Sequence, residues 1–166
     1  MFTRLIMSVL AAICFGLSMG ITGGTGAESY NVRDAALFVS LAGPAGASLT
    51  VTSAGFDTGE TTALAVQPGL SEFLLTAPAL STVILPNAST MTYNIVAADD
   101  AALTVSPTIL VAGAIVQTGA GGVGAAKATY RYRLPSVSQR YIGFTMVSGA
   151  AVTTAVGVSA TLEMVF

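Results

Sequence analysis

The most informative segment of the chain is Tyr130-Arg131-Tyr132-Arg133-Leu134-Pro135. In an extended strand, successive side chains point to opposite faces, so Tyr130, Tyr132 and Leu134 share one face and the two arginines share the other. Proline then interrupts the run, because it cannot donate a hydrogen bond to a neighbouring strand. The segment therefore predicts a half-buried strand whose tyrosines point opposite to its arginines.

Similar short runs of Val, Thr, Ile, Leu, Phe and Tyr recur from Ala35 onward, separated by Gly and Pro. No helical period of useful length follows residue 28. Strand starts every 8–15 residues or so are typical of a sandwich or barrel. We expect an all-β fold, an antiparallel β-sandwich of jelly-roll type over residues 30–166. The expected strands are 36–41, 48–54, 61–66, 70–76, 81–85, 91–97, 108–116, 127–134, 140–148 and 156–165.

Composition excludes several classes of chemistry. The 166 residues include no histidine and one cysteine, and charged residues make up 8% against 53% hydrophobic residues. A lone Cys14 cannot form an internal disulfide or a multi-cysteine metal site. Without histidine there is no Ser-His-Asp triad and no imidazole ligand. The net charge of −2 offers no footprint for nucleic acid. We therefore predict no enzymatic activity, no cofactor, no metal, no nucleic-acid partner and no small-molecule substrate.

The low charge points to a covered surface, since free monomers usually keep theirs wet with charged residues. The polar content is mostly 14 serines and 20 threonines, whose hydroxyls enter an interface at less desolvation cost than a charge. We expect a homo-oligomer attached to a larger protein assembly.

Residues 1–29 differ from the rest of the chain. Arg4 precedes an uncharged stretch at 5–21, and a Gly-rich hinge follows at 22–27. One interpretation is an apolar arm that is retained and packs against the sandwich or a neighbouring subunit. The other is a secretory signal that is cleaved near Thr25-Gly26-Ala27. Both stay open at this point.

Two motifs suggest ligand sites but lack the necessary context. Gly119 to Gly124 satisfies G-x-G-x-x-G, yet the residues that follow predict a strand, and the next acid is Glu163. We expect a loop between strands. Asp99-Asp100 and the scattered Asp57, Glu60 and Glu72 lack the spacing of an EF-hand, so we expect the Asp pair to be solvated in a turn.

The segment 130–141 holds three of the six basic residues and three of the five tyrosines. Tyr and Arg are favoured in protein interfaces. The alternative is a strand with its tyrosines in the core, and both interpretations stay open. The candidate interface residues are Tyr130, Arg131, Tyr132, Arg133, Arg140 and Tyr141.

The last third of the chain resembles the jelly-roll capsid cement (decoration) proteins of tailed double-stranded DNA phages. The resemblance rests on Leu134-Pro135 with Gln139-Arg140-Tyr141, on Val147-Ser148-Gly149, and on the apolar run 156–165. In that family an LP…QRY segment precedes a strand, and a VSG turn and a last apolar strand follow. The arm at 1–29 departs from the family pattern.

The resemblance implies a structural virion protein that binds the outer surface of a phage capsid and stabilises the shell. Its implied partners are the major capsid protein and further copies of itself, as a homodimer or homotrimer. The alternative is an exported β-sandwich, a secreted or cell-surface subunit such as a fimbrial one, with residues 1–27 removed as a signal peptide.

Overall fold

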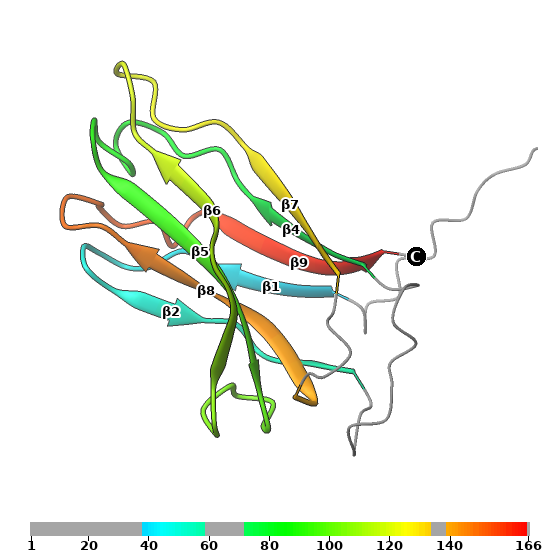
Figure 1. Ribbon diagram of the computed structural model, residues 1–166. Helices are drawn as coiled ribbons and strands as arrows, with labels where there is room; N and C mark the ends of the chain where they lie inside the picture. Colours follow the sequence, from blue (N-terminus) through cyan, green and yellow to red (C-terminus); the bar gives the residue numbers. More distant parts are fainter. Residues whose placement is uncertain (1–37, 59–71, 134–138, 166) are drawn as a thin grey trace, which may run out of the picture. The chain divides into compact units, whose positions relative to one another are not determined.

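The computed structural model describes residues 38–58, 72–133 and 139–165, which all belong to one compact unit, Arg33–Phe166. Every regular element within these ranges is a β-strand, and no helix occurs in them (Figure 1). The all-β expectation is therefore confirmed. The arm predicted for 1–29, the strand expected at 61–66 and the Leu134-Pro135 part of the family-like motif lie outside the described residues.

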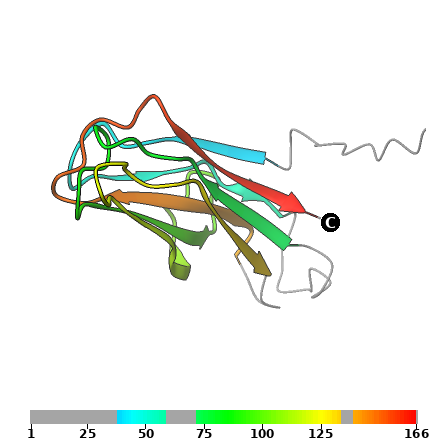
Figure 2. The same cartoon turned by 90° about the horizontal axis from the view of Figure 1, so that it is seen from above.

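The strands form two antiparallel sheets (Figures 1 and 2). The first, called sheet A here, contains in spatial order β1 (Phe38–Ala42), β9 (Ser159–Val165), β4 (Glu72–Ala77) and β7 (Ala128–Arg133). Sheet B contains β2 (Thr50–Thr52), β8 (Tyr141–Ser148), β5 (Thr90–Ala98) and β6 (Thr108–Thr118), and β3 (Phe56–Asp57) also pairs with β8. Strands that are distant in sequence are thus neighbours in both sheets.

β2 and β3 lie one after the other along β8, separated by a short interruption. Ser53 bridges it, because its backbone N–H donates to the Phe144 carbonyl at 3.0 Å. The Ser53 hydroxyl then accepts the Phe144 N–H, also at 3.0 Å, where a backbone carbonyl would serve in a regular ladder. The two short strands therefore act as one interrupted strand at the edge of sheet B.

The two sheets share one hydrophobic core. Phe73 and Leu75 of β4 are fully buried in the same cluster as Tyr93 of β5 and Phe144 of β8. The rings of Phe56 and Phe73, from different sheets, meet edge to face with centroids 5.7 Å apart. Burying side chains of this size stabilises a fold by roughly 1.5–3 kcal/mol each. Each sheet thus turns its alternating apolar side chains toward the other sheet, and both sheets bury them in one core.

The strand expected at 81–85 is wrong. Ser81 to Leu85 forms a turn in which the Ile84 and Leu85 N–H groups donate to the Ser81 carbonyl at 3.1 and 2.8 Å. The segment is bounded by Pro78 and Pro86, neither of which can donate a hydrogen bond to a neighbouring strand. Leu85 is fully buried within the core. The apolar run therefore fills the end of the core and does not extend a sheet.

Candidate interaction surface

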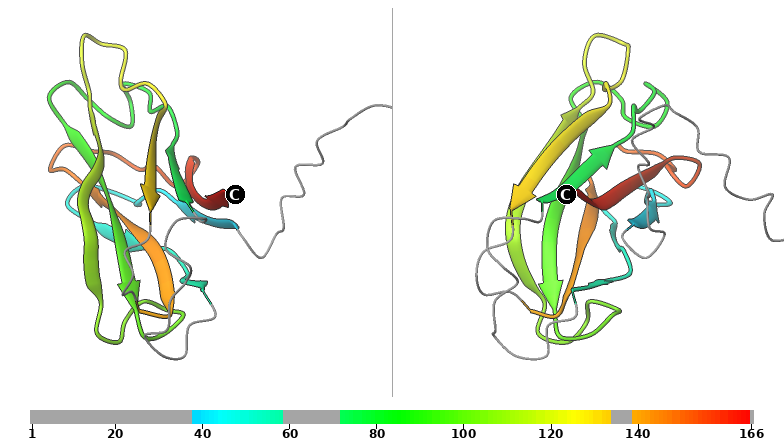
Figure 3. Two further views of the ribbon diagram at one scale, coloured as in Figure 1. Left: turned by 45° about the vertical axis from the view of Figure 1, so that its right-hand side comes forward. Right: turned by 90° about the vertical axis from the view of Figure 1, so that its right-hand side faces the viewer.

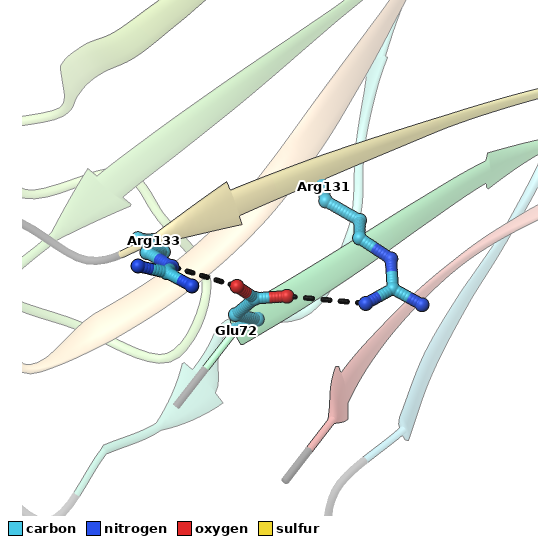
Figure 4. Close-up of polar contacts among 3 residues, drawn as sticks. All are labelled: Glu72, Arg131 and Arg133. Atoms are coloured by element: carbon cyan, nitrogen blue, oxygen red, sulfur yellow. Dashed lines mark hydrogen bonds and ion pairs between the residues drawn. The ribbon is translucent and has the colours of Figure 1, made fainter. Parts of the chain in front are cut away.

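Arg131 and Arg133 project from β7, the edge strand of sheet A, toward one carboxylate (Figure 4). Glu72 lies directly opposite Arg133 in the register between β4 and β7. Arg133 Nε donates to Glu72 Oε1 at 2.7 Å, and Arg131 Nη1 donates to Glu72 Oε2 at 3.2 Å. The Arg133 hydrogen bond is the main reason that the pKa of Glu72 falls below its usual value.

These ion pairs are exposed to solvent. The arginine side chains are 67% and 74% exposed, so their contribution to stability is small. One carboxylate nevertheless receives both guanidinium groups and so brings them together. An exposed pair of arginines can donate its remaining N–H groups to an acceptor on a partner surface.

Tyr130 and Tyr132 point the other way. Both are half buried and pack against the core, and the alternation with Arg131 and Arg133 is confirmed. Tyr132 pairs with the buried Phe73 across the strands, and burial, with a smaller effect of Tyr130, raises the pKa of Tyr132. The two tyrosines therefore anchor β7 to the sheet, as the core interpretation of this segment expected.

Arg140 and Tyr141 lie at the start of β8 in sheet B. Arg140 donates two hydrogen bonds to the Asp57 carboxylate, from Nε to Oδ1 at 3.0 Å and from Nη2 to Oδ2 at 2.8 Å. Its guanidinium carbon is 5.2 Å from the centre of the Tyr141 ring, within the range of a cation–π contact. The bond to Asp57 is the main cause of the raised pKa of Arg140.

The structure divides the six candidate interface residues between the two sheets. Four lie on β7 of sheet A, whereas Tyr141 begins β8 of sheet B and Arg140 directly precedes it. Tyr141 packs against a small separate cluster of Val96, Ala98 and Leu103. The pair Arg131 and Arg133 is brought together by Glu72, whereas Arg140 is bound to Asp57. The segment therefore supplies two small polar clusters.

Three of the acidic candidates, Asp57, Glu72 and Asp100, have side-chain hydrogen bonds in the structure, and Glu60 lies outside the described residues. Asp100 organises the loop after β5, because its Oδ1 accepts the N–H groups of Thr104 and Val105, both at 2.7 Å. The bond from Val105 is the main cause of the lowered pKa of Asp100. The Asp pair lies in a solvent-exposed bend, as expected, and the Asp100 carboxylate in addition closes the loop. Within the described ranges, no three acidic or thiol side chains are placed to hold a metal ion.

The Gly119–Gly124 motif lies in the loop between β6 and β7, as expected, and a strand follows it. A dinucleotide site would need a helix there. Packing explains the outer glycines, because a Cβ on Gly119 would collide with the Pro86 carbonyl and one on Gly124 with the Leu80 carbonyl. The motif therefore serves the close approach of two loops.

A buried polar network escaped the sequence analysis. Gln117 is only 4% exposed, and its Oε1 accepts the hydroxyl of the fully buried Tyr93 at 2.9 Å. Its Nε2 donates to the carbonyls of Pro78 and Ala126, both at 2.7 Å. The side chain thus ties β6 to segments that flank sheet A. The available signal was a single amide within the otherwise apolar run Thr108–Thr118.

The chain matches no protein-family model, no curated protein and no solved structure. Among the residues that the structure describes, no helix is long and apolar enough to cross a membrane.

Proposed function

We propose that the described domain is a β-sandwich of jelly-roll type. A jelly roll is one long antiparallel hairpin of eight strands wrapped into two sheets, so first pairs with last, second with seventh, and so on inward. With β2 and β3 counted as one interrupted strand, the observed pairs follow that rule. They are β1 with β9, β2/β3 with β8, β4 with β7, and β5 with β6.

We further propose that the protein is a structural virion protein that binds the outside of a phage capsid and stabilises the shell. The observation that carries the proposal is the position of the family-like motif in this strand order. The Gln139-Arg140-Tyr141 segment leads into β8, Val147-Ser148-Gly149 closes that strand, and the apolar run 156–165 contains the last strand, β9.

The motif residues have physical roles in this arrangement. Gln139 Nε2 donates to the Ser106 carbonyl at 2.6 Å, and Arg140 binds Asp57. The Ser148 hydroxyl donates to the Gly46 carbonyl at 2.7 Å and accepts the Leu49 N–H at 2.9 Å. A Cβ on Gly149 would press on the backbone of Thr90. The motif residues therefore brace both ends of β8.

The proposed mechanism is mechanical. A shell lattice offers many equivalent sites, so modest contacts by many subunits together resist outward pressure on the shell. The low charge of the chain suits such a role, since few charges must be desolvated on binding. The proposal includes a homodimer or homotrimer and no catalytic step.

One observation favours a second candidate, an exported surface or fimbrial subunit. The basic start, the uncharged stretch 5–21 and the small residues at 25–27 are also the layout of a secretory signal. Sequencing the N-terminus of the native protein separates the two, because a cleaved signal would remove residues 1–27.

A cosedimentation assay tests the capsid proposal. Emptied heads of the phage whose genome encodes the chain are mixed with purified full-length protein and pelleted. We expect saturable binding, weakened by Arg131→Ala and Arg133→Ala but unchanged by Thr129→Ala, an exposed control on the same strand. If the protein stays in the supernatant, the capsid role is wrong. If both arginine variants bind like the wild type, the interface does not include β7.

A further inference from the structure

Four loops meet at one end of the domain and form a continuous layer. In an antiparallel fold, alternate connections fall at the same end, and here these are the segments after β1, β4, β6 and β8. They are residues 43–49, 78–89, 119–127 and 149–158, together called the loop layer. All four gather on the left and upper left of Figure 1, away from the C-terminus of the chain.

Hydrogen bonds join the loops in sequence. The Gly43 N–H donates to the Val158 carbonyl at 2.9 Å, which links the first loop to the last. The Thr153 N–H donates to the Ile84 carbonyl at 3.1 Å, which links the last to the second. Leu80 and Ala125 exchange two N–H···O bonds of 2.8 Å, which link the second to the third. The layer is therefore one connected surface.

The loop layer carries almost no charge. Its only ionisable side chain is Lys127, at the border with β7, and the rest is mostly Ala, Gly, Ser, Thr and Val. The other charged residues that the structure describes lie on β3, β4, β7 and β9, in the loop after β5, or just before β8. They are Asp57, Glu72, Asp99, Asp100, Arg131, Arg133, Arg140 and Glu163. Charge is thus segregated within the domain.

Each loop also exposes one large apolar side chain. Val123 is 79% exposed, Val83 73%, Val156 58% and Leu49 44%. Four more exposed apolar side chains, Phe38, Val105, Ile109 and Val116, lie outside the loop layer. Single exposed apolar residues are ordinary, but four of them on one connected and nearly uncharged layer favour a surface that is covered by protein.

Val123 sits on a preorganised support. The loop after β6 protrudes at the top of both views in Figure 3, where it is yellow. Its tip is closed by bonds from the Val123 N–H to the Ala120 carbonyl at 3.1 Å and from the Ala120 N–H to the Gly124 carbonyl at 3.2 Å. The base is held by the close packing of Gly119 and Gly124 on the second loop. A fixed apolar knob costs little ordering entropy on binding.

We propose that the loop layer is the surface through which two or more copies of this chain associate. A nearly uncharged face is complementary to itself, because packing it against a copy opposes no like charges except Lys127 at its border. A nucleic acid or an acidic partner would require cations, and a lipid surface would favour basic and aromatic side chains. The proposal rests on the homo-oligomer of the proposed function. It deepens that function by assigning the contact between copies to a surface other than β7.

The test introduces a charge on the layer and, as a matched control, outside it. Val83→Asp and Val123→Asp alter highly exposed residues, so neither should unfold the domain. Val105→Asp adds the same charge to the loop after β5, where Val105 is 52% exposed. The association of each full-length protein is measured by sedimentation equilibrium over a wide concentration range, with circular dichroism as the check of folding.

We expect the wild type and Val105→Asp to form the same oligomer. Val83→Asp and Val123→Asp should associate at least about tenfold more weakly, because an apolar contact is lost and a charge is buried. A monomeric wild type would overturn the inference, as would layer variants that associate like the control. Layer variants that keep the oligomer but lose binding to heads would also overturn it, because the layer would then face the shell. An oligomer broken only by the layer variants supports it, even where the wild type fails to bind heads and the capsid proposal falls.

Discussion

The buried amide of Gln117 should be worth a large share of the stability of the domain. Replacing it in Gln117→Leu keeps a similar volume but removes three hydrogen bonds, to the Tyr93 hydroxyl and to the carbonyls of Pro78 and Ala126. An unsatisfied buried polar group costs about 1–3 kcal/mol. Tyr93 is fully buried, whereas Pro78 is half buried and Ala126 is exposed, so water can replace part of what the two carbonyls lose. We therefore expect a loss of about 1–3 kcal/mol, against a total of about 5–15 kcal/mol for a domain.

A double-mutant cycle isolates the side-chain pair. Tyr93→Phe alone should cost about 1–3 kcal/mol, because it leaves Gln117 Oε1 without a donor in the core. In the double variant that loss is not counted twice, so the coupling energy should be about 0.5–3 kcal/mol.

Equilibrium urea unfolding measures each free energy, and Thr118→Val on the exposed side of β6 serves as the control. The control should change stability by less than about 0.5 kcal/mol. The reasoning fails if Gln117→Leu costs less than about 1 kcal/mol, or if the two single changes are additive.

Three further predictions concern pH, a loop and the N-terminus. The pKa of Glu72 is lowered in the folded state, so its carboxylate stabilises the fold above the usual pKa of 4.5. This stabilisation is lost as the pH falls through the folded-state pKa. In Glu72→Gln, the free energy of unfolding measured with urea should therefore depend less on pH in the acid range. Gly124→Ala should destabilise more than Gly121→Ala in the same assay, since both have positive φ but only Gly124 would also press on the Leu80 carbonyl. Equal losses would contradict the packing argument. Deleting residues 1–27 should leave the two-sheet domain folded by circular dichroism while weakening oligomerisation or attachment to heads; unchanged assembly would refute the arm hypothesis.

The strands could be predicted where their sequence carries a simple alternation. Tyr130 to Arg133 alternates core and solvent residues along an edge strand, so the orientation of each side chain followed from the period alone. Ser81 to Leu85 has the composition of a strand, but its place is decided by tertiary packing of Leu85 and by a turn between two prolines. The strand propensity of a short segment does not show whether tertiary packing will favour a turn there.

The polar sites were harder to predict for a different reason. Arg131 and Arg140 are close in sequence, yet the connection between β7 and β8 passes from one sheet to the other, so they belong to different clusters. The partners of Gln117 are backbone carbonyls, and any residue type can supply these. The low total charge was visible in the composition. That the charged residues lie away from the loop layer could be recognised only from the strand order.

Electron cryomicroscopy of native particles from the source of the gene tests the capsid proposal most directly. The account predicts density for a two-sheet domain on the outer surface of the head, with copies in contact through their loop layers. Heads that lack the chain, together with its recovery from the cell envelope without residues 1–27, would contradict the account and support the exported subunit.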